Sequence, residues 1–359
     1  MIPAARHAER RERLRALLRE AVPARAMLVT DLASIRYLTG FSGSNGVLLV
    51  GGDASADLVG TDGRYRDQVA AEAPGLPAII DRDTLSAVAR RAPAGPLAIE
   101  PSLPVGDERW LAAERGPVVV TDGLVAGLRS VKDPDEVALL EQACAITVAG
   151  LAALAEGIRV GDTEVGLARR LEQIFGSLGA EDRAFDSVVG AGPHSAIPHH
   201  QPGRRPLQAG DLLVVDAGAR VAGYHADMTR TFVVGAGPEG WQCEIHAAVW
   251  AAHAAAAAEY RPGADARSVD GVARSVIDSA GLSDAFTHGL GHGVGLEIHE
   301  APMVGPRATG SMAADMAITV EPGVYLPGRG GVRIEDTLVV TGNGPRVLTE
   351  APRDLVVVG

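Results

Sequence analysis

The stretch DLLVVDAGARVAGYHADMTRTFVVG, residues 211–235, contains two runs of β-forming residues that flank a short segment of small residues. It predicts a β-hairpin that turns at Val221 and Ala222. With that turn, Asp216 and Asp227 lie directly opposite each other, with both side chains on one face of the hairpin. Two ionised carboxylates in such apolar surroundings either share a proton or bind a cation. A single aspartate near glycine is usually a turn residue, whereas a pair in strands indicates a cation site.

A second hairpin repeats this arrangement with glutamates. In AITVEPGVYLPGRGGVRIEDTLVV, residues 317–340, a turn centred on Gly328 brings Glu321 opposite Glu335. One glutamate in a strand usually faces solvent, so either residue alone is a weak sign of a site. Two mirrored pairs predict that four carboxylates converge, provided that the two hairpins face each other.

Each hairpin follows two predicted helices, which indicates an internal duplication. Asp133 can cap the first of these helices, and Pro134 suits its first helical position. The alanine-rich run before Tyr260 predicts a packed helix, because alanine is the best helix former. The repeated order of helix, helix and hairpin occupies residues 134–156, 163–178 and 211–234, and then 240–261, 266–280 and 316–341.

Four converging carboxylates carry a charge of about −4, which two divalent cations about 3.5–4 Å apart would neutralise. A nitrogen ligand can come from FTHGLGHGVGLEIHE, residues 286–300, where His288, His292 and His299 lie among glycines. Oxygen-rich ligation with one imidazole suits manganese or cobalt and tolerates zinc or iron. The sequence therefore predicts two divalent metal ions, with manganese as the expected metal and cobalt, zinc or iron as alternatives.

Short apolar runs alternate with helical patterns in the first third of the chain, which predicts an α/β domain. At 359 residues the chain exceeds the usual single-domain length of about 100–200 residues, so two domains are expected. We expect an N-terminal α/β domain over residues 1–132 and a duplicated α+β catalytic domain over residues 133–359. The apolar runs lie at 26–30, 46–50, 96–100 and 117–121.

Composition excludes several classes of partner. The formal charge of −12 opposes binding to nucleic-acid phosphates. No apolar run approaches the roughly 20 residues of a membrane helix, and the amino end lacks the apolar stretch of a secretory signal. The two cysteines, Cys144 and Cys243, favour a reducing compartment over a disulfide scaffold. We therefore expect a cytoplasmic protein that binds neither nucleic acid nor membrane.

Several motifs resemble the metallopeptidase family of aminopeptidase P, prolidase and methionine aminopeptidase: DAGARVAGYHADMTRT, GLGHGVGLEIHE, VEPGVY and GVRIEDT. This resemblance covers the C-terminal two-thirds of the chain and implies the duplicated pita-bread fold. In the N-terminal third, SIRYLTGFSGSNGVLLV and TDGRYRDQ resemble the extra domain of creatinase and the proline-specific members, which methionine aminopeptidase lacks. The implied protein is a homodimeric Xaa-Pro aminopeptidase or Xaa-Pro dipeptidase, a metallo-exopeptidase that cleaves peptides with proline at the second position.

Carried over position by position, the resemblance implies a role for each matching residue. The implied metal ligands are Asp216, Asp227, His292, Glu321 and Glu335. The implied catalytic residues are His199, His299 and Glu321; His299 hydrogen-bonds the reacting carbonyl and Glu321 also accepts a proton. The residues implied to line the pocket for proline and its carboxyl side are His288, Tyr325 and Arg333.

Two alternatives stay open at this point. The chain could be another amide or amidine hydrolase on the same fold, creatinase-like or ectoine-hydrolase-like, or a non-catalytic peptide-binding protein. The five intact ligand positions count against creatinase-like chemistry, which does not need the metals, and against a binding protein, which would typically have lost ligands. His225 lies two positions before Asp227 and could contact substrate, although packing is the favoured interpretation. His200, His246 and His253 are interpreted as ordinary core or surface histidines.

Overall fold

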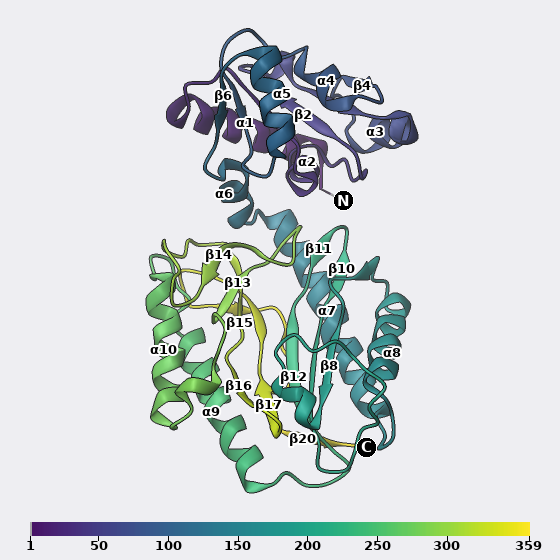
Figure 1. The fold of residues 1–359 in the computed structure, drawn as a ribbon, viewed down its shortest axis with the longest axis vertical. Helices are drawn as coiled ribbons and strands as arrows, with labels where there is room; N and C mark the ends of the chain where they lie inside the picture. The colour runs from purple at the N-terminus through teal and green to yellow at the C-terminus, as the bar shows by residue number, and fades with distance from the viewer. Residues whose placement is uncertain (1) are drawn as a thin grey trace. The chain divides into compact units, whose positions relative to one another are not determined.

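The structure, a computed structural model, describes residues 2–359. The chain divides into two compact units, Met1–Arg129 and Ser130–Gly359, each with its own sheet and hydrophobic core (Figure 1). The expected domain boundary after Lys132 stays a prediction.

The first unit is an α/β domain built on one mixed six-stranded sheet with the order β4-β3-β2-β1-β5-β6. β1 runs antiparallel to β2 and parallel to β5. The side chains of Leu28, Leu49 and Ile99 lie in the hydrophobic core of this unit. The strands are β1 (Ala26–Val29), β2 (Val47–Val50), β3 (Leu58–Thr61), β4 (Ala78–Ile80), β5 (Leu97–Ile99) and β6 (Val118–Val120). The helices are α1 (Ala4–Ala21), α2 (Leu32–Thr39), α3 (Arg66–Glu72), α4 (Thr84–Ala89), α5 (Val105–Arg115) and α6 (Leu124–Ser130).

The second unit contains the predicted order of helix, helix and hairpin twice. The first copy comprises α7 (Pro134–Gly157), α8 (Glu164–Ser177), β9 (Leu212–Ala217) and β12 (Met228–Val234), with β10 (Ala219–Val221) and β11 (Tyr224–His225) at the turn. The second comprises α9 (Gly240–Ala257), α10 (Ala266–Ser279), β15 (Ala317–Val320) and β18 (Asp336–Val339), with β16 (Gly323–Leu326) and β17 (Gly330–Arg333) at the turn. The other strands are β7 (Asp182–Arg183), β8 (Val188–Ala191), β13 (Gly291–Gly293), β14 (Glu300–Val304), β19 (Arg346–Val347) and β20 (Val356–Val358).

The two helix pairs flank the strands of this unit on opposite sides (Figure 1). α7 and α8 pack on the sheet of order β20-β12-β9-β8 through a core that includes Leu154, Leu171 and Val215. α9 and α10 pack on the sheet of order β14-β13-β15-β18-β19 through a second core that includes Val249 and Ile318. The hairpins therefore meet between two layers of helices.

The helix that opens this unit begins as the sequence predicts. Asp133 accepts hydrogen bonds from the backbone amides of Asp135 and Glu136, the Glu136 carboxylate returns one to the amide of Asp133, and Pro134 occupies the first turn. Among the described residues, α7 alone is long and apolar enough to cross a membrane, but 44% of that window is buried inside the unit. One face of α7 packs in the hydrophobic core through residues that include Leu151 and Leu154.

The register of the first hairpin corrects one prediction. Asp216 lies opposite Thr229 and not opposite Asp227, because the chain turns at Ala222 and Gly223. Both turn residues have positive φ angles, 48° and 83°, which suit a tight hairpin turn and which a β-branched residue such as Val221 strongly disfavours. The shift of two residues keeps both aspartates on the same face.

The second hairpin has the register expected from a turn centred on Gly328, where φ is 75°. Val320 pairs with Asp336, and Gly323 pairs with Arg333. Glu321 and Glu335 therefore lie opposite each other between these two ladders.

Candidate metal centre and active site

The predicted site residues converge on one open cavity of about 780 Å³ in the second unit. Tyr325 is the exception among them and lies behind the lining, with its hydroxyl 2.9 Å from Nε2 of His288. The predicted residues that line the cavity are His199, Asp216, Asp227, His288, His292, His299, Glu321, Arg333 and Glu335.

The four carboxylates reach this cavity from the two hairpins. Asp216 belongs to β9, Asp227 and Glu335 immediately precede β12 and β18, and Glu321 follows β15. Hydrogen bonds join the hairpins here: the amide of Glu335 donates to the carbonyl of Thr229 over 3.2 Å, and Thr337 donates to the carbonyl of Asp227 over 2.9 Å. The duplication thus brings two carboxylates from each half to one place.

Burial and mutual repulsion disfavour ionisation of Asp227, Glu321 and Glu335. Burial, then the charges of Glu335 and Asp216, raise the pKa of Asp227 well above its usual range. Burial, followed by the charges of Glu321 and Asp216, does the same to the pKa of Glu335. Burial also raises the pKa of Glu321 to about 8. A nearby cation would relieve all three effects, because an opposite charge favours the ionised form.

His292 is oriented to offer a lone pair to this cluster. Its Nδ1 lies 3.0 Å from the carbonyl of Gly293 and therefore donates a proton, which leaves Nε2 as the unprotonated nitrogen. Nε2 lies 3.5 Å from oxygens of Asp227 and Glu321. Burial lowers the pKa of His292 to about 4, so the ring is neutral. A carbonyl that fixes the outer nitrogen is typical of histidines that bind metals.

One cationic side chain of the protein already contacts the cluster. Arg333 donates to Oδ2 of Asp216 over 2.6 Å and to the hydroxyl of Tyr325 over 2.8 Å. The other oxygen of Asp216 is buried without a hydrogen-bond partner. One guanidinium offsets only one of four carboxylate charges, and an orphaned buried oxygen is uncommon in a folded protein.

The residues present therefore fit divalent cations. Ligand atoms of Asp227, His292 and Glu335 lie within 4.8 Å of one another, and all three residues are buried. Hard oxygen donors with one neutral imidazole are ligands of Mn²⁺, Co²⁺, Zn²⁺ or Fe²⁺.

Of the other four histidines that line the cavity, the predicted site residues are His199, His288 and His299. The ring of His299 lies 4.4 Å from that of His292, and burial lowers the pKa of His299. Burial and the charge of Arg333 lower the pKa of His288 to about 4. Since Tyr325 accepts from Arg333, its hydroxyl can donate to Nε2 of His288. His199 lines the same part of the cavity.

Sequence reasoning missed several residues that shape the site. The hydroxyl of Thr229 donates a hydrogen bond to Glu335 over 2.6 Å and accepts one from Nε of Arg333. The hydroxyl of Thr231 donates to the backbone carbonyl of Arg333 and accepts from its amide. The signal was the alternation of Asp227, Thr229 and Thr231 on one face of a strand.

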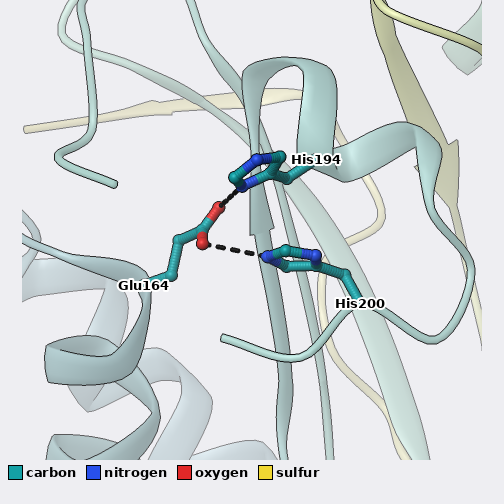
Figure 2. Close-up of side chains that lie close together, drawn as sticks. All are labelled: Glu164, His194 and His200. Atoms are coloured by element: carbon teal, nitrogen blue, oxygen red, sulfur yellow. Dashed lines mark hydrogen bonds and ion pairs between the residues drawn. The ribbon is translucent and has the colours of Figure 1, made fainter. Parts of the chain in front are cut away.

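Two histidines that sequence reasoning did not connect form a cluster with a glutamate. His194 and His200 both point at the carboxylate of Glu164, as Figure 2 shows. His225, in contrast, packs: its Nδ1 lies 2.9 Å from the carbonyl of Gly295, and it is absent from the cavity lining.

Comparison with known proteins agrees with this geometry. Residues 138–342 match the model of metallopeptidase family M24, and residues 10–131 match that of the creatinase/prolidase N-terminal domain. The Xaa-Pro dipeptidase of Pyrococcus horikoshii is 39% identical over 262 residues, which cover 72% of this chain and 74% of that protein.

Solved structures resemble the whole chain. The Xaa-Pro dipeptidase from Bacillus anthracis has a TM-score of 0.92 and 33% identity, and the match covers 98% of this chain and 100% of that one. The X-Pro aminopeptidase from Thermotoga maritima has a TM-score of 0.89 and 31% identity over 97% and 99% of the two chains.

Proposed function

Because this chain belongs to metallopeptidase family M24, we propose that its carboxylate-lined cavity hydrolyses the bond between an N-terminal residue and proline. The chain is a metallo-exopeptidase of the Xaa-Pro type with a duplicated pita-bread catalytic domain. The observation that carries this assignment to the cavity is its group of four acids and one neutral imidazole, in which the buried Asp227 and Glu335 resist ionisation unless a cation is present.

The ligands that we propose for two divalent cations are Asp216, Asp227, His292, Glu321 and Glu335. Bound there, the cations would supply Lewis acidity at the scissile carbonyl and lower the pKa of a water molecule. Glu321 accepts the proton that the attacking water loses and passes it to the proline nitrogen as the carbon–nitrogen bond breaks. His299 and His199 present N–H groups to the carbonyl oxygen while it becomes negatively charged.

His288 and Arg333 form a wall of the cavity that holds the proline side of the substrate, and Tyr325 supports both residues from behind. Burial raises the pKa of Tyr325 to about 12, so its hydroxyl keeps its proton and can orient His288. Arg333 stays cationic and lies where a substrate carboxyl group would be attracted. The bond before proline is a tertiary amide without an N–H group, so selection depends on the shape of this wall.

Several finer properties are part of the same proposal. We assign manganese as the metal, because oxygen-rich ligation with one imidazole suits it. The buried Cys144 and the exposed Cys243 are both free, which supports a cytoplasmic location. We further propose a homodimer and a division at residue 132 between the creatinase/prolidase-type N-terminal domain and the catalytic domain.

The test uses enzyme stripped of metal with a chelator and reloaded with manganese, cobalt or zinc. We expect hydrolysis of Ala-Pro, of Ala-Pro-Ala, or of both after reloading, and little hydrolysis of the matched Ala-Ala. Cleavage of the dipeptide alone identifies a dipeptidase, and cleavage of the tripeptide identifies an aminopeptidase. Full activity without metal, or no preference for proline, would refute the proposed function.

A further inference from the structure

A second acid and histidine cluster lies outside the proposed metal centre. Glu164 is the first residue of α8, and its side chain is completely buried. His194 and His200 approach it from a segment that follows β8 (Figure 2). Nothing in the proposed chemistry uses this cluster, although His200 also lines the cavity.

The Glu164 carboxylate accepts four hydrogen bonds, two on each oxygen. Oε1 accepts from the amide of Ala191 over 2.9 Å and from Nδ1 of His194 over 2.8 Å. Oε2 accepts from Nε2 of His200 over 2.9 Å and from the amide of Gly203 over 3.0 Å. Burial raises the pKa of this carboxyl, but the hydrogen bonds outweigh burial and lower it below its usual value. Glu164 is therefore an ionised, fully satisfied anion.

Those four donors bracket one loop of the chain. Ala191 ends β8 and Gly203 lies beyond His200, so a single carboxylate ties both ends of segment 191–203 to α8. The interior of the same segment is tied to the second hairpin, because Gly331 donates to Oγ of Ser195 over 2.9 Å. The loop is thus held from two directions.

This loop delivers groups to the cavity. It carries His199 into the lining, and the carbonyl of Pro198 accepts from Nη1 of Arg333 over 3.3 Å. Both groups lie between residues that Glu164 holds. A loop without such ties samples many conformations, and a displacement of about 1 Å in a catalytic group can cost about 10²-fold in rate.

Ligand atoms of Glu164, His194 and His200 lie within 4.8 Å of one another, but the hydrogen bonds argue against a metal ion in this cluster. The two imidazoles are tilted by 32° with centroids 4.3 Å apart. Nδ1 of His194 and Nε2 of His200 point at different oxygens of the same carboxylate. Each of those oxygens also accepts a backbone amide, which a cation would have to displace.

We propose that Glu164, acting through His194 and His200, is a positioning residue that fixes the 191–203 loop and thereby places His199 against the substrate. This inference rests on the proposed function, since it takes the role of His199 from there. Glu164 itself does not contact substrate.

The test is a double-mutant cycle between Glu164→Gln and His199→Ala in the metal-loaded enzyme. Glutamine keeps the shape of the side chain but turns an NH₂ group toward two donors. We expect Glu164→Gln to lower kcat for Ala-Pro or Ala-Pro-Ala by about tenfold or more while metal content and KM change little. In the His199→Ala background the same change should have almost no further effect. The matched control is Glu172→Gln, which makes the same chemical change on the same helix. It removes an ion-pair partner of Arg183 and should behave as wild type.

Hydrogen exchange of segment 191–203 is measured on the same proteins and should be faster in Glu164→Gln. An equal kcat loss in both backgrounds, or no loss at all, would overturn the inference, as would loss of a third metal equivalent from the cluster. If the wild-type enzyme cleaves neither proline peptide, the proposed function is wrong. Hydrogen exchange of segment 191–203 that is the same in wild type and Glu164→Gln would separately refute the role of Glu164 in fixing this loop. If Glu164→Gln does not fold, His200→Ala takes its place in the cycle.

Discussion

The protein contains two clusters in which histidines surround buried acids, and the two differ in how the acid charges are compensated. In the cluster of Asp227, Glu335 and His292, neighbouring carboxylates repel one another and burial raises the acid pKa values. In the cluster of Glu164, every carboxylate lone pair has a donor and the acid pKa is lowered. The first arrangement needs a cation and the second does not. Residue composition alone cannot distinguish them, whereas the count of donors can.

The largest expected effect follows removal of one of the acids that we propose as metal ligands. Glu335→Ala should lower metal content at both positions and reduce kcat by more than about 10³-fold, since loss of even one transition-state donor typically costs about 10²–10³-fold. Metal analysis and turnover are measured on the same preparation. The comparison between the clusters breaks if this variant keeps its metal.

A smaller and more selective effect is expected at His299. His299→Ala should keep near-normal metal content while kcat falls by roughly 10²-fold, with KM less affected, because a proton donor typically contributes about 10²–10⁴-fold. His292→Ala is the matched control and should lose metal and activity together. Metal loss in His299→Ala would show that the ligand has been misassigned within residues 286–300.

The pH dependence of stability should have opposite signs in the two clusters. Folding of the metal-stripped protein raises the pKa of Glu321 from 4.5 to about 8. The folded state is therefore favoured by this group below pH 4.5, and that contribution to the free energy of unfolding is lost as the pH rises from 4.5 to about 8. The lowered pKa of Glu164 contributes stability above its ordinary value that is lost as pH falls.

Thermal unfolding of stripped protein from about pH 3 to about pH 8 tests this difference, with reloaded protein and Glu164→Gln as comparisons, because the Glu164 contribution is lost only below its ordinary pKa of 4.5. Metal should remove the loss at high pH, and the glutamine variant should be less sensitive to acid. A stripped protein that becomes more stable toward pH 8 would contradict the account of the first cluster.

The smallest effect should follow a change in a partly exposed ion pair. Glu172→Gln removes the carboxylate charge on α8 that forms an ion pair with Arg183 over 3.0 Å. It should change the free energy of unfolding by no more than about 1 kcal/mol and leave hydrolysis unchanged, because water screens such pairs. Denaturant unfolding measures this change. A loss comparable to that of Glu164→Gln would mean that any disturbance of α8 affects the loop.

Much of the catalytic unit was predictable from local patterns. The glutamate hairpin has the predicted register because Gly328 defines its turn, and the helix cap at Asp133 is as expected. The aspartate hairpin was predicted two residues out of register, because the pattern alone did not show that Ala222 adopts a positive φ angle.

The Glu164 cluster illustrates what local patterns cannot show. Its hydrogen bonds join α8 to residues about 30 positions away, and no periodicity relates Glu164 to His194 or His200. Sequence reasoning interpreted His200 as an ordinary core or surface histidine and did not identify Glu164 as its hydrogen-bond partner. Long-range polar contacts of this kind depend on how the helix and the loop pack.

The most direct test of the central claim is a titration of stripped wild-type enzyme with Mn²⁺, with bound metal and hydrolysis of Ala-Pro and Ala-Pro-Ala measured in each sample. The account predicts that activity rises with occupancy and saturates at two equivalents per chain. Hydrolysis at full rate without metal, or a third equivalent that disappears in Glu164→Gln, would contradict the distinction between the two clusters.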